Sequence, residues 1–123
     1  MFNPRKDATI SKMVCFSNRY ILGDKHNYKQ DDYNSWQELK EDIIRKEYPY
    51  VILPLYLYDH SGITISTRPF SCEWDSGQVG FIYTTKEILK ENGIDNILNL
   101  DEIKDLLREE TLDYDSYLRG DEN

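Results

Sequence analysis

The sequence has few cysteines, no long hydrophobic run and none of the common nucleotide-binding motifs. With no export signal at the polar N-terminus, we expect the two cysteines, Cys15 and Cys72, to be free thiols rather than a disulfide. No stretch approaches the roughly 20 apolar residues that a membrane-spanning helix needs. Neither GxxxxGK(S/T) nor GxGxxG occurs, so we expect no glycine-rich phosphate loop. These absences favour a cytoplasmic protein without a cofactor.

Basic residues are also scarce, since 15 Lys and Arg stand against 23 Asp and Glu, for a net charge of −8. Residues 85–123 hold 12 acidic and 5 basic side chains, a balance of −7, whereas residues 1–84 hold 11 and 10, a balance of −1. A negative field repels phosphate backbones, so we expect no direct binding of nucleic acid. It attracts basic surfaces, including the grooves of nucleic-acid-binding proteins. A plainer explanation is that acidic helices keep a small protein in solution.

A length of 123 residues predicts one domain, over residues 1–123. Hydrophobic periodicity predicts that its fold is of the α+β class. Alternating apolar residues predict strands at 11–16, 50–58, 63–67 and 79–84. A short link at residues 60–62 favours a hairpin between the second and third strands. Pro54 cannot donate to a sheet ladder, so it argues for an edge position or a bulge, and Gly80 suggests a bulge or a close backbone approach.

Helical spacing predicts three helices. Their N-caps are expected at Ser35, Thr84 and Asn99, each followed three residues later by a glutamate. The expected fold is a small antiparallel sheet of three or four strands packed against about three helices. We expect residues 1–9 to be flexible and residues 85–123 to form an acidic helical part.

A central motif at residues 59–83 concentrates reactive and turn-forming side chains. We single out five residues of its loop: His60, Phe70, Cys72, Trp74 and Asp75. Cys72, His60 and Asp75 are the residue types of a nucleophile, a base and an orienting acid. Catalytic triads are made by geometry rather than by proximity in sequence, so we favour a structural role for these residues. We expect no metal site, because no CxxC or HxxxH spacing is present.

The motif also carries a resemblance. The segments HSGITIST at 60–67, PFSC at 69–72 and WDSGQVGFIY at 74–83 resemble a family of small proteins encoded by bacteriophages and mobile elements. A weaker match at 114–121 extends the likeness over residues of about 50–121. Family members often continue into further strands, which suggests that this chain is a shortened or specialised member. The resemblance implies an accessory protein acting inside a bacterium, and it implies no catalytic residues.

Two functions follow as hypotheses. The first is a non-enzymatic inhibitor of a host defence protein, such as a CRISPR effector or a restriction enzyme, that imitates nucleic acid with acidic side chains. Its candidate partner-binding residues are Asp101, Asp105, Glu109, Glu110, Asp113 and Asp115. The alternative is a cysteine-dependent enzyme or a small-ligand-binding protein with its site at the 59–80 loop. We favour the inhibitor and a chain that is not an enzyme; a homodimer is a further possibility.

Overall fold

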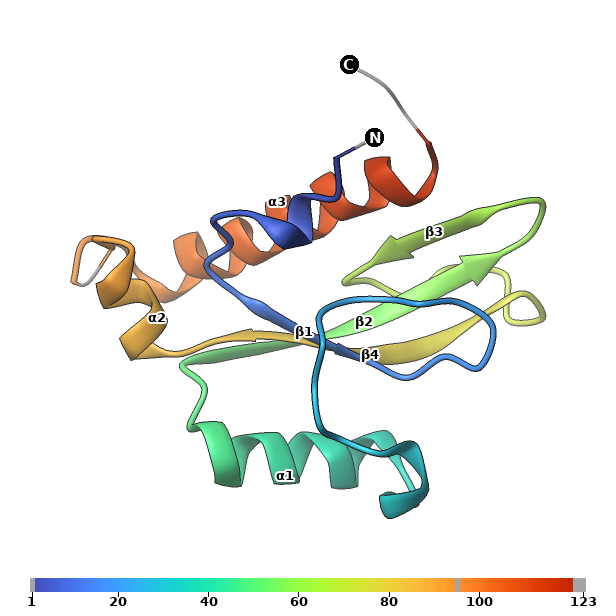
Figure 1. Cartoon of the computed structure of the whole chain (residues 1–123), viewed down its shortest axis with the longest axis horizontal. Helices are drawn as coiled ribbons and strands as arrows, with labels where there is room; N and C mark the ends of the chain where they lie inside the picture. The colour runs from blue at the N-terminus through green and yellow to red at the C-terminus, as the bar shows by residue number, and fades with distance from the viewer. Residues whose placement is uncertain (1, 95, 121–123) are drawn as a thin grey trace.

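The strand-forming segments pair into one antiparallel sheet that helices cover from both faces (Figure 1). The computed structural model describes residues 2–94 and 96–120. The sheet has the order β1-β4-β2-β3, and its strands are β1 (Lys12–Cys15), β2 (Val51–Asp59), β3 (Ile63–Ser66) and β4 (Ser76–Thr84). Helix α3 (Leu100–Leu118) lies on one face and α1 (Trp36–Glu47) on the other, while α2 (Lys86–Glu91) lies beyond the end of β4. The predicted α+β fold is confirmed.

The predicted hairpin between β2 and β3 is also confirmed. Its three-residue turn places Ser61 and Gly62 at positive φ, 56° and 135°. Pro54 lies beside a register shift between Leu55 and Tyr56, so the predicted bulge is present. Strand β2 as a whole lies between β4 and β3. Since β3 reaches only as far as Tyr56, the registered partner of Pro54 is on β4 alone.

Side chains of the two sheet faces build two apolar clusters. Against α3 and α2, the sheet buries Met13, Leu55, Ile65 and Ile82 together with Leu89, Ile103, Leu107 and Tyr114. Against α1, it buries Val14, Phe81 and Tyr83 with Leu39 and Ile43. The alternation of strand residues between two covered faces explains why strands β2 and β4 are apolar on both sides.

The helix caps confirm two of the three predicted starts. Ser35 accepts a hydrogen bond from the backbone N–H of Glu38, and Asn99 and Glu102 form the reciprocal capping box of α3. The predicted cap at Thr84 is wrong, because Thr85 caps α2 instead. The fully buried Thr84 hydroxyl donates to the carbonyl of Ile10, at 2.5 Å.

None of the helices in the described part of the chain is long and apolar enough to cross a membrane.

Arg5 ties the N-terminal segment to the rest of the fold. A short 3-10 helix, η1 (Pro4–Lys6), places Arg5 against α3, and only 1% of the Arg5 side chain is exposed. Its guanidinium forms an ion pair with Asp24 at 2.7 Å and another with Glu110 at 3.4 Å. The sequence could not show this, because both carboxylates lie far from Arg5 along the chain.

Candidate functional site

Helix α3 carries a row of four exposed carboxylates. Asp101, Asp105, Glu109 and Asp113 are spaced four residues apart, and all four side chains are exposed. Residues four apart lie on one helix face, about 6 Å apart along the axis, because each residue rises about 1.5 Å. We call these four residues the acidic row.

Little within the protein neutralises the acidic row. Asp105 forms an ion pair with Arg108 at 2.8 Å on the surface. The attraction within a surface ion pair is weak, because water and salt screen both charges. Within residues 2–94 and 96–120, Asp101, Glu109 and Asp113 have no hydrogen-bonded or ionic partner. The row therefore presents negative charge to solvent along about three turns of the helix.

Two of the six predicted partner-binding acids, Glu110 and Asp115, face the interior of the protein. Glu110 accepts hydrogen bonds from the backbone N–H of Ile10 at 2.8 Å and from the Ser11 hydroxyl at 2.5 Å. Asp115 is buried and accepts from the backbone N–H of Ile65 at 2.9 Å. Both carboxylates hold other segments to α3, so Glu110 and Asp115 are not part of the exposed surface. Their partners, Ile10, Ser11 and Ile65, come from segments that pack against α3.

The loop at residues 67–75 is tied down at several points. The Phe70 ring packs on Tyr58 of β2, with ring centroids 5.6 Å apart. The Ser76 hydroxyl donates to the carbonyl of Cys72, and the backbone N–H of Asp59 donates to the carbonyl of Asp75 at 2.7 Å. This part of the central motif is an ordered corner.

His60, Cys72 and Asp75 are brought together, with Asp75 in the middle. One carboxylate oxygen of Asp75 lies 3.2 Å from Nδ1 of His60 and 3.9 Å from the thiol sulfur of Cys72. In a cysteine triad the histidine contacts the thiol, and the acid lies behind the histidine. Here the acid contacts the thiol, and its negative charge repels a thiolate. This arrangement holds a loop rather than activates a nucleophile.

The other cysteine, Cys15, is buried in the apolar cluster that packs against α3. Burial raises the pKa of Cys15 to about 12, with a smaller contribution from the charge of Asp24. The described residues contain no cluster of three or more His, Cys, Asp and Glu side chains that could hold a metal ion.

The two aromatic residues of the motif loop have different environments. Phe70 faces the sheet, whereas Trp74 is 96% exposed. A second loop reaches the same corner, since Arg19 and the Tyr20 hydroxyl both bind the Asp59 carboxylate at 3.0 Å. The hydrogen bond to Asp59 raises the pKa of Tyr20. No sequence signal connects Arg19 or Tyr20 with the motif, because they lie about 40 residues before it.

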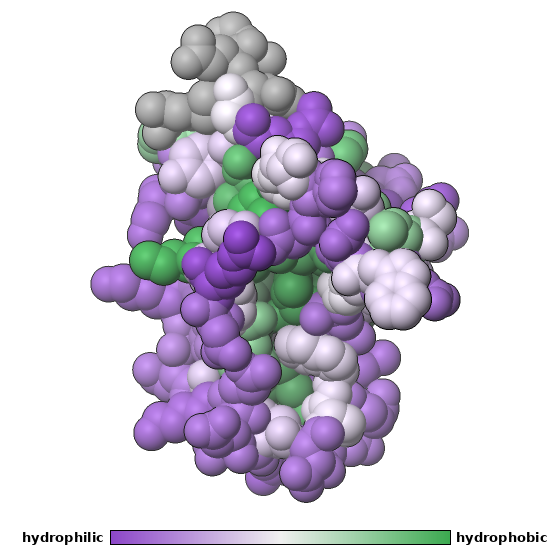
Figure 2. All heavy atoms as spheres, turned by 90° about the vertical axis from the view of Figure 1, so that its right-hand side faces the viewer, coloured by the Kyte–Doolittle hydropathy of each residue, from purple (hydrophilic) through white to green (hydrophobic). Residues whose placement is uncertain are grey.

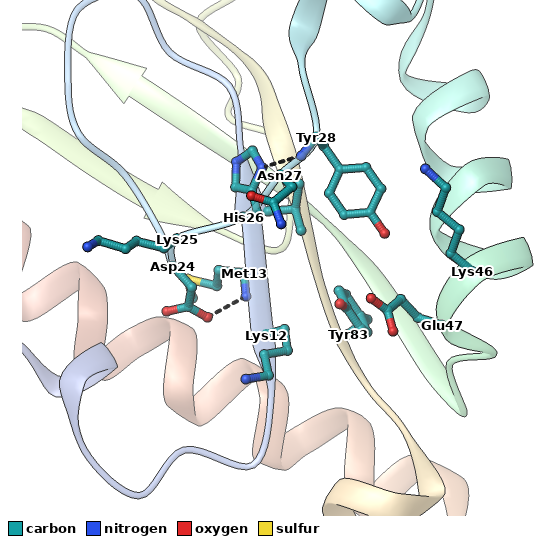
Figure 3. A pocket seen from close by; sticks show the side chains of 11 residues that line it. Lys12, Met13, Asp24, Lys25, His26, Asn27, Tyr28, Lys46, Glu47 and Tyr83 are labelled. Carbon is teal, nitrogen blue, oxygen red and sulfur yellow. Dashed lines mark hydrogen bonds between the residues drawn. The ribbon is translucent and has the colours of Figure 1, made fainter.

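The lining of a cavity of about 340 Å³ contains no residue of the acidic row or of the 59–80 loop. It opens between β1, residues 24–28 and the end of α1 (Figure 3). Its histidine is fully engaged: Nε2 of His26 donates to the carbonyl of Cys15, and Nδ1 accepts from the backbone N–H of Tyr28. Burial, followed by the charge of Glu47, raises the pKa of Tyr83 in the cavity wall. No predicted site residue lines this cavity, so it does not support the predicted ligand site at the 59–80 loop.

The geometry therefore offers two features for function: the acidic row on α3 and the ordered corner that displays Trp74. The resemblance to a phage and mobile-element family stays a prediction. The chain matches no protein-family model, and comparisons with curated proteins and with solved structures give no match.

Proposed function

We propose that this protein binds a nucleic-acid-binding defence protein in the cytoplasm of a bacterium and inhibits it. The defence protein would be a CRISPR effector or a restriction enzyme, and the inhibitor would act for a bacteriophage or mobile element. The observation that carries the proposal is the acidic row of Asp101, Asp105, Glu109 and Asp113 on one exposed helix face.

The acidic row suits a basic groove for two reasons. Regularly spaced negative charges imitate the phosphates that such a groove binds, and a net charge of −8 steers the protein toward it. Leu112, 62% exposed, lies beside Asp113 and offers an apolar contact within the charged surface. Binding of this kind competes with nucleic acid and needs no catalytic group.

The experiment uses the triple charge reversal D105K/E109K/D113K. Bacteria carrying either a CRISPR system or a restriction system are challenged with phage while they express the wild-type chain or the variant. We expect the wild-type chain to restore plaque formation and the triple variant to lose this effect. The purified wild-type chain should bind the purified defence complex more weakly as salt rises, because exposed charges are screened.

The matched control is D31K/E41K/E91K, which changes net charge by the same amount at exposed acids of η2 (Gln30–Asp32), α1 and α2. We expect it to inhibit nearly as well as the wild-type chain. Circular dichroism and thermal unfolding should show that both variants are folded. If D105K/E109K/D113K inhibits as well as the wild-type chain, mimicry by the acidic row is wrong.

A further inference from the structure

A second cavity, of about 220 Å³, lies where helix α1 begins, and it shares no lining residue with the cavity of Figure 3. Three aromatic and three polar side chains line it: Phe16, Tyr33 and Trp36, with Gln30, Asn34 and Ser35. Helix α1 begins toward the right-hand side of Figure 1. Figure 2 faces that side and shows hydrophobic and intermediate residues between hydrophilic ones. We call this space the aromatic cavity.

The three rings of the aromatic cavity stand in a row with Phe16 in the middle. The centroid of the Phe16 ring lies 6.2 Å from that of Tyr33 and 5.8 Å from that of Trp36, and the ring planes differ by 25° and 26°. Nearly parallel rings at this separation are offset from one another, so part of each π face stays uncovered. These faces carry negative charge and attract a cation that comes within about 6 Å of a ring centroid.

Two of the rings are fixed from behind. Trp36 packs edge-on against Phe81 of β4, with ring centroids 6.3 Å apart. The Tyr33 hydroxyl donates to the carboxylate of Asp42 in α1, at 2.5 Å. Because these contacts order the rings in the unliganded protein, a ligand that binds among them costs little conformational entropy.

The surroundings of the aromatic cavity are acidic. Of the described residues, no Lys, Arg or His lines it. Residues 29–42, which supply all of the lining except Phe16, contain five acidic and two basic side chains, a balance of −3. The Glu38 carboxylate accepts from the backbone N–H of Asn34 at 2.9 Å, so a negative charge lies at the rim. The cavity therefore favours a positively charged ligand.

The protein already holds one cation beside this group of rings. The ammonium of Lys46 lies 5.3 Å from the centroid of Tyr28, and that ring lies 6.5 Å from Tyr33. Burial, followed by the hydrogen bond to Asp42, raises the pKa of Tyr33, and the charge of Asp32 contributes to the same effect. Ring faces and carboxylates thus act together at this wall of the cavity.

We propose that the aromatic cavity binds a quaternary ammonium ion, such as choline or another small trimethylammonium compound. The charge of such an ion is spread over methyl groups, which pack on ring faces and donate no N–H. The Ser35 hydroxyl in the cavity wall already accepts from the backbone N–H of Glu38 at 3.2 Å, so the wall suits a cation that needs few acceptors. A cavity of about 220 Å³ is smaller than the roughly 300–1,000 Å³ of pockets for drug-sized ligands, which fits a small ion. This inference goes beyond the proposed function and does not depend on it.

The test is a titration of the isotope-labelled chain with choline chloride, followed by two-dimensional NMR. The matched control ligand is dimethylbutanol, in which a carbon atom replaces the charged nitrogen of choline, and sodium chloride corrects for ionic strength. We expect choline to shift the signals of Phe16, Tyr33 and Trp36 with a dissociation constant of about 1 mM. The neutral alcohol should bind at least about 10-fold more weakly, because it gains nothing from the ring faces or the carboxylates.

Two variants assign the binding site. Trp36→Leu removes a π face but keeps an apolar side chain, and it should weaken choline binding at least about fivefold. Its control is Trp74→Leu, because Trp74 is 96% exposed and does not line the cavity; this variant should bind choline within about twofold of wild type. D31N/D32N neutralises two exposed carboxylates of η2 and should weaken choline binding about twofold or more at low salt, with dimethylbutanol unaffected.

The outcomes that overturn the inference are separate from those for the acidic row. Equal binding of choline and dimethylbutanol would show an apolar site without preference for charge. The inference also fails if choline at about 20 times the expected dissociation constant shifts no signal, or if Trp74→Leu loses as much affinity as Trp36→Leu. Thermal unfolding checks that the variants are folded. If Trp36→Leu is not, unchanged choline affinity in D31N/D32N contradicts recognition of the charge.

Discussion

At Gly80, the absence of a side chain allows strands β1 and β4 to pair. A Cβ atom at this position would overlap the carbonyl oxygen of Val14 and lie 2.9 Å from the Cα of Cys15. Both neighbours are backbone atoms of a paired strand, so neither can move without breaking the ladder. The bulge or close approach that we predicted from a glycine inside a strand is therefore present, and its physical reason is steric.

We expect Gly80→Ala to lower the free energy of unfolding by at least about 3 kcal/mol, because overpacking against rigid backbone is costly. Gly77→Ala is the matched control in the same strand, since a Cβ there meets nothing within 4 Å. It should change stability by less than about 1 kcal/mol. Urea denaturation measures both, and equal effects of the two substitutions would contradict the steric explanation.

Individual residues also mark the limits of prediction from sequence. Ser35 and Asn99 could be identified as caps because a capping side chain acts within three residues of itself. The same local criterion favours Thr84, which has Glu87 three residues after it, but the hydroxyl of Thr84 binds Ile10 and Thr85 caps the helix instead. Nothing local shows whether Phe70 or Trp74 faces the sheet, because a loop has no periodicity that fixes the direction of its side chains.

At the level of elements, α3 uses its acids in two ways. The acidic row faces solvent, whereas Asp115 binds the edge of the sheet through the backbone N–H of Ile65 and the Thr64 hydroxyl, at 2.9 and 2.5 Å. Asp115 thus satisfies a donor of β3 that no further strand pairs with, since β3 is the last strand in the sheet order.

This division predicts different costs for two substitutions in one helix. Asp115→Ala should lower the free energy of unfolding by about 2–3 kcal/mol, because it leaves the buried N–H of Ile65 without its partner. Asp113→Ala removes an exposed carboxylate and should change stability by less than about 0.5 kcal/mol. Thermal and urea unfolding provide the measurement. A stability loss for Asp113→Ala as large as that for Asp115→Ala would mean that the row has a structural role.

Elements were easier to predict than their contacts. The four strands and three helices follow from periodicity and caps, which are local properties. The inward turn of Asp115 depends on Ile65, 50 residues away, and that of Glu110 depends on Ile10, 100 residues away. A pattern of acids along a helix cannot reveal such partners, so the sequence could not show that Glu110 and Asp115 face the interior.

For the whole molecule, the position of the charge matters more than its sum. The sequence predicted an acidic C-terminal part, and the structure arranges four of its carboxylates in one exposed line on a scaffold that is anchored at its N-terminal segment by Arg5. Like charges four residues apart on a helix repel each other and destabilise it by about 0.2–0.5 kcal/mol per pair. The acidic row contains three such pairs in succession, which is a cost that a purely structural helix would not need to keep.

Substitution of Glu109 tests whether the protein gives up stability for this surface. Glu109 has Asp105 four residues before it and Asp113 four residues after it, so Glu109→Gln removes two repulsive pairs. We expect it to raise the free energy of unfolding by about 0.5 kcal/mol, measured by urea denaturation at low salt. It should also weaken binding to the defence protein, because one of the four mimicking charges is lost.

Glu41→Gln is the control: Glu41 is exposed and has Arg45 four residues after it, so its loss should not stabilise the fold. A stability gain together with weaker binding is expected only if the row is kept for a partner, whereas a loss of stability in Glu109→Gln would show that the row supports the helix itself.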